Sequence, residues 1–394
     1  MSLRQTPLEQ KQLAQFLHYL VGTGYNIQDS YEDGLSLELL EQQEAPKQEK
    51  TGWDDRVLLD VEKARVAREE AAKKQQQKTV HATSELFHKK LLTFIEEKLT
   101  HPEVVLNKLL KLSDAAVDLL AHAALPNPRL SVLGGIIDLN PEIARRILFL
   151  VNNPKFMKQL KREPKKVTKL QAAIGMIGID VIRLIIPLML FKYRIAMDHP
   201  YSRLAGRKLW RAMLTLSLTC EFQLEKQEYR RPLEGIMLGF LYCLGPLAIY
   251  QQFMQSFEEL KYQFLSDARN QGNKAFHDAL FVVEPQLDVL EQLWEKHQEP
   301  LSVALAKLAF DDAFPHLIYA MEEEAEDKVF DQRGVLGQSL FRGVRFSLFE
   351  QLRNAKLFDH KDLPAWITHM ELTQEGFEEL HKAQLFRVDY HKFT

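Results

Sequence analysis

The stretch of sequence that decides the fold is residues 232–245, Pro-Leu-Glu-Gly-Ile-Met-Leu-Gly-Phe-Leu-Tyr-Cys-Leu-Gly. Almost every side chain in it is apolar, which predicts a helix that belongs to the protein core. Gly245 and Pro246 should end this helix, and Pro246 can begin the next one because its fixed φ suits the first helical turn.

Helical patterns also dominate on both sides of this stretch. Apolar residues recur at helical spacing and strand-like alternation is nearly absent, so we expect an all-α protein. Shifts in composition predict an N-terminal helical and charged extension at 1–83, a main domain at 84–325 and a C-terminal helical extension at 326–394. The polar and acidic residues 28–52 are interpreted as a linker.

Local signals place individual helices. Apolar positions mark a short helix over 13–20 and a solvated helix over 54–78. Asn140 and Pro141 should start a helix, with the Asn140 side chain as its cap. Two separate helices are predicted on either side of Pro300, at 284–297 and at 301–310.

The chain as a whole is nearly neutral, so its net charge attracts a charged partner only weakly. The chain has 51 basic and 54 acidic side chains, so any binding of nucleic acid or of a membrane surface has to be local. Cys220 and Cys243 are its only cysteines, and they show neither metal-ligand spacing nor a disulfide framework. With no apolar segment typical of a signal peptide at the start, we expect a cytoplasmic protein.

One segment, Ala172–Phe191, has the length and apolar character of a membrane span. It contains Asp180 and Arg183, and each charge at the centre of a span costs roughly 3 kcal/mol. Gly178 and Pro187 also interrupt it. We therefore expect two buried helices and no membrane span.

Residues 232–245, read together with 209–212 (Leu-Trp-Arg-Ala), resemble the metal-site helices of the HD phosphohydrolase superfamily, in the variant called the HDOD domain. That family shows a Gly-Leu-Leu-His-Asp-Ile-Gly-like run whose adjacent His and Asp hold a divalent metal in catalytic members. Residues 137–148 and 171–183 resemble further blocks of the family in the same order, so the resemblance covers about 84–325. It implies an HD-like helical bundle.

At the metal positions this chain departs from the pattern. Tyr242 and Cys243 stand where the family has its His-Asp pair, and Ala212 or its neighbour Met213 stands where a further His is expected. A phenol and a thiol are poor substitutes for a hard nitrogen and oxygen donor pair. We therefore expect no catalytic residue, no metal and no cofactor. The two helices should instead pack through core stripes, which are Leu209, Met213, Leu216 and Cys220 on one and Leu233, Met237, Phe240 and Leu244 on the other.

The resemblance implies a regulatory role rather than an enzymatic one. It favours a bacterial protein that acts through contacts with protein partners in a signalling pathway. Two alternatives stay open: a metal-dependent phosphohydrolase with atypical ligands, and a nucleotide- or nucleic-acid-binding module that uses the basic segment 155–169. His277 and Asp278 form a literal His-Asp pair, but the apolar context of the family is missing there, and we interpret the pair as a polar helix edge.

Two basic features are candidate contacts for an anion or a partner. The first is a run of cations opposed only by Glu163, made of Lys155, Lys158, Lys161, Arg162, Lys165, Lys166 and Lys169. The second is an arginine stripe at i,i+4 spacing, formed by Arg203, Arg207 and Arg211. If the stripe faces the former metal site it could hold an anion there, and if it faces water it contributes only to solubility.

The C-terminal extension contains an amphipathic helix. Its apolar face is formed by Leu340, Phe341, Val344, Leu348 and Leu352, and Arg342, Arg345 and Arg353 lie around that face. The face could dock a partner or pack onto the main domain, and packing is the commoner outcome.

Overall fold

The computed structural model describes residues 6–21, 60–125, 128–192, 195 and 200–385, except for the side chains of 21, 60–73 and 200–203. Every regular element within these ranges is a helix, so the prediction of an all-α protein is confirmed. The linker predicted at 28–52 lies outside the described residues.

The chain forms two compact units. The larger one is built from residues 1–25, 91–257 and 286–394, and the smaller one from 26–90 and 258–285. The division into 1–83, 84–325 and 326–394, which we expect from composition, stays a prediction.

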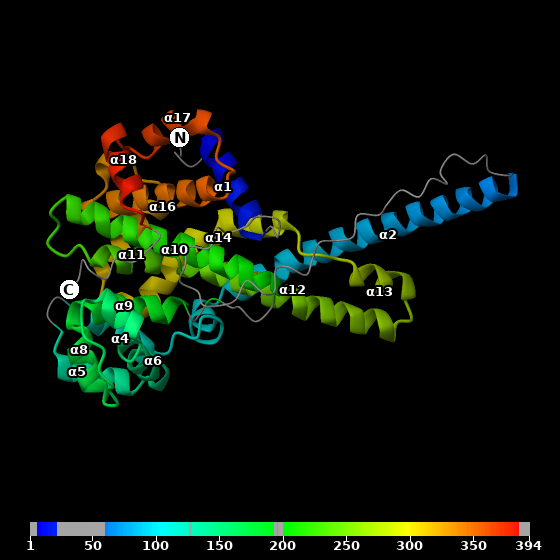
Figure 1. The fold of residues 1–394 in the computed structure, drawn as a ribbon. Coiled ribbons are helices and arrows are strands. Elements are labelled where there is room, and N and C mark those ends of the chain that lie inside the picture. The colour runs from blue at the N-terminus through cyan, green and yellow to red at the C-terminus, as the bar shows by residue number, and fades with distance from the viewer. Residues whose placement is uncertain (1–5, 22–59, 126–127, 193–194, 196–199, 386–394) are drawn as a thin grey trace. The chain divides into compact units, whose positions relative to one another are not determined.

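The larger unit contains most of the helices (Figure 1). In chain order they are α1 (Pro7–Val21), the end of α2 (Asp60–Leu99), α3 (Pro102–Val104), η3 (Val105–Leu109), α4 (Asp114–Ala124), α5 (Leu130–Asp138), α6 (Pro141–Val151), α7 (Pro154–Gln159), α8 (Leu170–Ile177), α9 (Ile179–Lys192), α10 (Pro200–Lys226), α11 (Glu234–Tyr242), the start of α12 (Leu244–Asn270), α14 (Leu287–Phe310), α15 (Pro315–Ala325), η4 (Phe330–Gln332), α16 (Val335–Asn354), η5 (His360–Asp362), α17 (Leu363–His369) and α18 (Gln374–Lys382).

The stretch 232–245 forms α11, which packs directly against α10. Gly235 and Gly239 make this contact possible. A Cβ on Gly235 would lie 2.5 Å from the backbone nitrogen of Glu221, and one on Gly239 would lie 2.5 Å from Cα of Ser217. No real side chain fits at such distances, so the two glycines allow the backbones of the two helices to touch.

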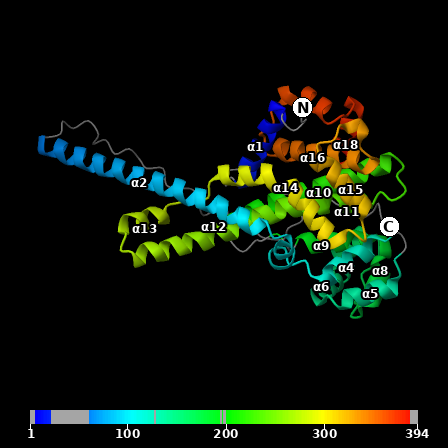
Figure 2. The same cartoon turned by 180° about the vertical axis from the view of Figure 1, so that it is seen from behind.

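Helix α16 packs along α10 as well, and Figures 1 and 2 show these helices side by side. The hydroxyl of Ser347 donates to the carbonyl of Ala212 at 2.8 Å, and that of Ser339 donates to the carbonyl of Cys220 at 3.1 Å. The amphipathic C-terminal helix therefore packs onto the main domain, as expected. Arg345, which the helical pattern placed at the edge of its apolar face, is buried.

The segment 172–191 forms two helices, α8 and α9, with a bend of 108° between them. Gly178 lies at the bend with φ of 91°, a conformation that L side chains rarely adopt. Most side chains of α9 are buried, which confirms the prediction of two buried helices. Among the described residues, the stretch 234–270, which α11 and α12 form together, is long and apolar enough to cross a membrane, and its most apolar window is wholly buried.

Two local predictions are wrong. Residues 287–310 form the single helix α14, with Pro300 inside it. Proline removes one backbone donor, but Trp294 and Leu305 are buried on either side of it, and this tertiary packing outweighs the local cost. Asn140 does not cap α6, because its side chain donates to the carbonyls of Ala115 and Ile136.

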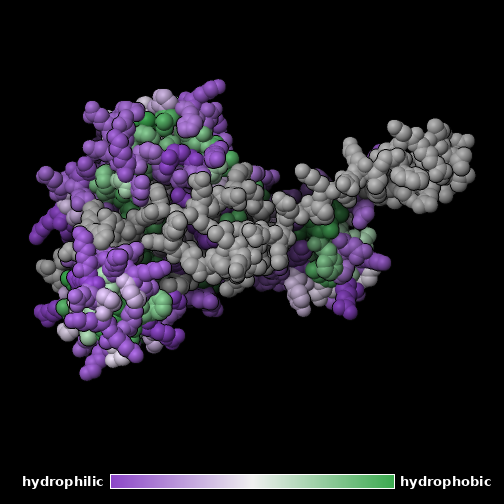
Figure 3. Space-filling view, in the orientation of Figure 1, coloured by the Kyte–Doolittle hydropathy of each residue, from purple (hydrophilic) through white to green (hydrophobic). Residues whose placement is uncertain are grey.

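The smaller unit contains the first part of α2, the end of α12 and α13 (Lys274–Phe281). Phe264 links them, with its ring centroid 5.7 Å from that of Phe87 and 6.2 Å from that of Phe276. Tyr262 and Phe281 are exposed, and Figure 3 shows apolar residues at the surface over α12 and α13. Residues 74–78 of α2 are all exposed, in agreement with the solvated helix expected there.

Candidate functional site

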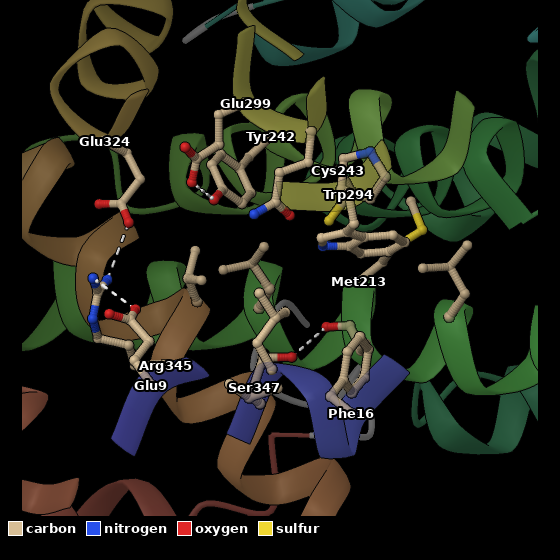
Figure 4. Close-up of a pocket in the computed structure, with 18 of the residues that line it drawn as sticks. Glu9, Phe16, Met213, Tyr242, Cys243, Trp294, Glu299, Glu324, Arg345 and Ser347 are labelled. Atoms are coloured by element: carbon tan, nitrogen blue, oxygen red, sulfur yellow. Dashed lines mark hydrogen bonds and ion pairs between the residues drawn. The ribbon is translucent and has the colours of Figure 1, made fainter. Parts of the chain in front are cut away.

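The structure brings together the three positions, Ala212, Tyr242 and Cys243, that the resemblance aligns with metal ligands. Ala212 lies on α10, Tyr242 is the last residue of α11, and Cys243 follows it directly. All three line one cavity of about 430 Å³, shown in Figure 4. Helices α1, α12, α14, α15 and α16 contribute the rest of the lining, so positions that the sequence placed on two helices lie in a cavity lined by seven.

The core stripes expected on α10 and α11 are present. Nearly all of their side chains are buried, and only Leu233 is half-buried. The cavity lies beside these stripes. Met213 and Leu216 from α10 line it together with Trp294 from α14. On this side the cavity therefore has an apolar and aromatic lining, and core side chains do not fill it completely.

Tyr242 takes part in a buried hydrogen bond. Its phenol donates to Oε1 of Glu299 on α14 at 2.8 Å, and both side chains are buried. Ser302 of α14 also forms hydrogen bonds with the backbone at the end of α11. Ser302 Oγ accepts from the backbone nitrogen of Gly245 at 3.0 Å and lies 2.6 Å from the carbonyl oxygen of Tyr242. This pairing satisfies backbone groups that the helix end leaves open.

Both cysteine thiols are protonated at neutral pH. Burial raises the pKa of Cys243 well above its usual range, and it raises the pKa of Cys220 to about 12. Because the thiolate is the form of cysteine that binds metal, Cys243 is a weak donor at this position.

A buried cluster of charges forms one end of the cavity (Figure 4). Nη1 of Arg345 lies 3.0 Å from Oε1 of Glu324, and its Nη2 lies 3.2 Å from Oε1 of Glu9 on α1. Glu324 also pairs with Arg333 through its second oxygen. His369 Nε2 lies 3.4 Å from Oε2 of Glu9. Two carboxylates thus face two guanidinium groups and one imidazole, so the charges in the cluster nearly balance.

The sequence patterns identified neither this cluster nor Glu299. Arg345 was assigned to the edge of an apolar face, and Glu324 belongs to an acidic run that was interpreted as a change of composition. Their partners lie far away along the chain: Glu9 is on α1, and Tyr242 and Glu299 are 57 residues apart. One signal was available, because a carboxylate within an apolar helical stripe needs a partner once it is buried.

Metal binding has no ready ligand set here. Within the part of the chain that the structure describes, no group of three or more His, Cys, Asp or Glu side chains is arranged to hold a metal ion. His277 and Asp278 lie on α13 in the smaller unit, with His277 Nδ1 3.4 Å from Asp278 Oδ1. Their polar contact is with each other, at the edge of a helix.

The arginine stripe does not line the cavity. The lining residues from α10 are Leu209, Ala212, Met213 and Leu216. Arg207 and Arg211 are half-buried, and the side chain of Arg203 is not described. Burial raises the pKa of Tyr19 on α1, and the nearby charge of Arg211 opposes this shift. Arg211 is therefore near α1 rather than directed into the former metal site.

In the basic segment, one residue has a structural role. Arg162 donates to the carbonyl of Met176 near the end of α8. The lysines predicted as contacts are exposed, namely Lys158, Lys161, Lys165 and Lys166. Whether they bind an anion or a partner stays a prediction.

Comparison with known proteins identifies one region. Residues 109–279 match the HDOD domain family. No curated protein matches the chain. The chain is similar to the crystal structure of a Shewanella amazonensis SB2B protein described as a "putative metal-dependent phosphohydrolase", with 16% identity and a TM-score of 0.45 over 77% of this chain and 97% of that one.

Proposed function

We propose that this HDOD-domain protein is a non-enzymatic regulator that acts in bacterial signal transduction through contacts with other proteins in the cytoplasm. The observation that carries the proposal is the state of the former metal positions. Tyr242, Cys243 and Ala212 surround a cavity, and none of them offers a donor suited to a divalent metal.

The polar groups near these positions have other partners. The Tyr242 phenol is engaged with Glu299, and the Glu324 carboxylate faces Arg333 and Arg345. A hydrolase of the HD type needs a metal that keeps positions open for water and for phosphate. Converting this site into one would require breaking buried pairs, each of which stabilises the packing of α14 or α16.

The first experiment measures bound metal and hydrolysis. Purified full-length protein is analysed for metals by mass spectrometry, and it is assayed with cyclic dinucleotides and bis(p-nitrophenyl) phosphate in the presence of Mg²⁺, Mn²⁺ or Zn²⁺. We expect substoichiometric metal and no turnover above a protein-free blank. Stoichiometric metal, or turnover that Glu299→Gln abolishes, would show that the protein is a phosphohydrolase with atypical ligands.

A second experiment addresses nucleic acids and nucleotides. Binding to single-stranded and double-stranded DNA and RNA is measured at two salt concentrations, for the wild type and for a variant with Lys158, Lys161, Lys165 and Lys166 changed to Ala. We expect weak binding that the substitutions hardly change. Tight binding that falls steeply with salt and is lost in the variant would indicate a nucleic-acid-binding module instead.

Partners are then sought in the native cell. Cross-linking followed by affinity purification of the full chain should recover a specific protein. Recovery should decrease in variants of the cavity residues on α10, α14 and α16 and remain unchanged in variants of the basic segment.

A further inference from the structure

Helix α1 covers the former metal site. Its residues Glu9, Gln10, Leu13 and Phe16 line the cavity from one side, while Tyr242 and Cys243 line it from another. In the chain, 38 residues (22–59) separate α1 from α2, so α1 is attached to the next helix only by a long stretch of sequence. Its position depends on the contacts that it makes with α10, α14 and α16.

The apolar part of this contact is one face of an amphipathic helix. Phe16, Leu17 and Leu20 are buried, whereas Ala14 and His18 on the opposite face are exposed. The ring of Phe16 meets that of Trp294 edge to face, with the centroids 6.3 Å apart. This spacing of apolar anchors is the one by which amphipathic helices bind grooves on other proteins.

Charged groups fix the direction of α1 in its groove. Near its beginning, Glu9 pairs with Arg345 at 3.2 Å, and Nζ of Lys11 lies 2.7 Å from Oδ2 of Asp362. Near its end, Nζ of Lys208 donates to the carbonyl of Tyr19 at 2.5 Å. A cation at the carboxyl end of a helix and an anion in its first turn both suit the helix dipole.

The fit beneath α1 is incomplete. Protein cores are close-packed and contain few voids larger than a water molecule. The cavity of about 430 Å³ is within the range of ligand-binding pockets, and α1 forms part of its wall. Where α1 borders this space it makes fewer packing contacts than it would against a filled core, which lowers the cost of opening α1.

We propose that α1 is an exchangeable cover, and that the groove between α10, α14 and α16 is the docking site for a helix of the signalling partner. This inference rests on the proposed function, because it assumes that the protein acts through protein contacts. The partner is an amphipathic helix with the chemistry of α1. It presents a carboxylate to Arg345 and His369, a cation to Asp362 two residues later, and an aromatic ring to Trp294 seven residues after the carboxylate.

While α1 occupies the groove, it lowers the apparent affinity for the partner. Because α1 belongs to the same chain as the groove, its binding to the groove is intramolecular, and a free helix has to compete with it. The apparent affinity falls by the fraction of molecules in which the groove is open. Any event that weakens α1 therefore activates binding, without a change in the groove itself.

Hydrogen exchange of the wild-type protein tests the first part of the inference. Backbone amides of α1 should exchange at least 100-fold faster than those of α10 and α11, because α1 opens locally while the core stays folded. Exchange of α1 at the same rate as α10 and α11 would overturn the proposal, since α1 would then open only with the whole unit.

Binding in trans tests the second part. The probe is a fluorescent peptide of residues 6–21, and the receptor is the full chain with Phe16, Leu17 and Leu20 changed to Ala, which weakens the internal α1 and leaves the rest of the groove intact. The peptide should bind this variant at least tenfold more tightly than it binds the wild type. Glu9→Lys in the peptide should weaken binding at least tenfold, whereas Ala14→Lys, on the exposed face, should leave it unchanged.

The other outcomes are equally informative. A folded triple variant that binds the peptide no better than the wild type would overturn the proposal. Unfolding of the triple variant would do the same, because it would identify α1 as an integral part of the core. These results are independent of the metal and hydrolysis assays: α1 can prove fixed in a non-enzymatic regulator, and it can prove exchangeable in a protein that turns out to hydrolyse phosphodiesters.

Discussion

Helix α10 makes two contacts of different kinds, one with α11 and one with α1. Against α11 the backbones touch at Gly235 and Gly239, and there is no room for a single extra methyl group. Against α1 the contact borders a cavity of about 430 Å³ and includes the amino group of Lys208, which donates to the carbonyl of Tyr19. The first contact is typical of a permanent core, and the second is typical of an interface.

The difference shows that one helix can belong to a tightly packed core on one side and border a cavity on another. At the glycine contact, α10 and α11 are held by close backbone packing. Around the cavity, Glu299, Glu324 and Arg345 hold neighbouring helices by charge and hydrogen bonds. The core contact and the surroundings of the cavity are therefore stabilised by different interactions.

The largest effect on stability is expected when the buried cluster of Glu324, Arg333 and Arg345 loses its carboxylate. Glu324→Gln removes a carboxylate that faces both Arg333 and Arg345 and leaves two buried guanidinium groups without it. The free energy of unfolding should fall by about 3–5 kcal/mol, measured by urea denaturation. Glu378→Gln is the matched control, because Glu378 pairs with Lys382 at the surface and should cause no measurable change. Equal stability of the two variants would contradict the assignment of Glu324 to a buried cluster.

The glycine contact should be nearly as sensitive. Gly239→Ala places a methyl group 2.5 Å from Cα of Ser217 and forces α10 and α11 apart. We expect a loss of about 3 kcal/mol in the same denaturation assay. Gly135→Ala in α5 is the control, because nothing lies within 4 Å of its added Cβ. That substitution should stabilise the protein by about 0.5–1 kcal/mol through its helical preference. A loss in both variants would show that packing at Gly239 is not the cause.

Lys208 should make the stability depend on pH. Burial lowers its pKa from 10.5 to about 8, so below about pH 8 the folded protein has to bury a charged amine. Between about pH 8 and about pH 10 the unfolded chain keeps a proton that the folded chain has lost, and stability rises with pH. Lys208→Met should remove a gain on the order of 2 kcal/mol across this window, measured as the difference between wild type and variant. Parallel pH profiles would contradict the prediction.

The smallest effect is expected at the surface end of the α1 groove. Lys11 and Asp362 form a partly exposed pair, and such pairs contribute little to stability. Lys11→Asp should loosen α1 slightly, seen as faster hydrogen exchange in α1 alone, and the second substitution Asp362→Lys should restore the wild-type rate. Failure of the reversed pair to restore it would show that this contact does not orient α1.

Much of the fold could be predicted because helical patterns are local. The helix over 13–20, the core helix in 232–245 and the pair separated by Gly178 all follow from apolar spacing and from glycine or proline at the ends. The break at Pro300 could not be decided in this way. Proline carries a local cost, and whether the helix continues depends on packing that the local pattern does not contain.

For the candidate site, the sequence patterns pointed to three residues that line the cavity. They did not identify the side chains from other helices that contact this site, such as Glu299. Ala212, Tyr242 and Cys243 line one cavity, at two helices that pack together, and their correspondence to the metal positions of the family stays a prediction. The arginine stripe was a plausible lining by spacing alone, and its residues do not line the cavity. Helical spacing defines a face but does not say which neighbour that face meets.

The sequence by itself determined most of the helices and their buried faces, because these depend on residue type and on spacing within one segment. Only the tertiary structure decided that Glu9 and Glu299 meet at this site with α1 as its cover. The physical reason is that a buried charge or phenol is stable only beside a partner, and the partner is brought there by the packing of distant helices.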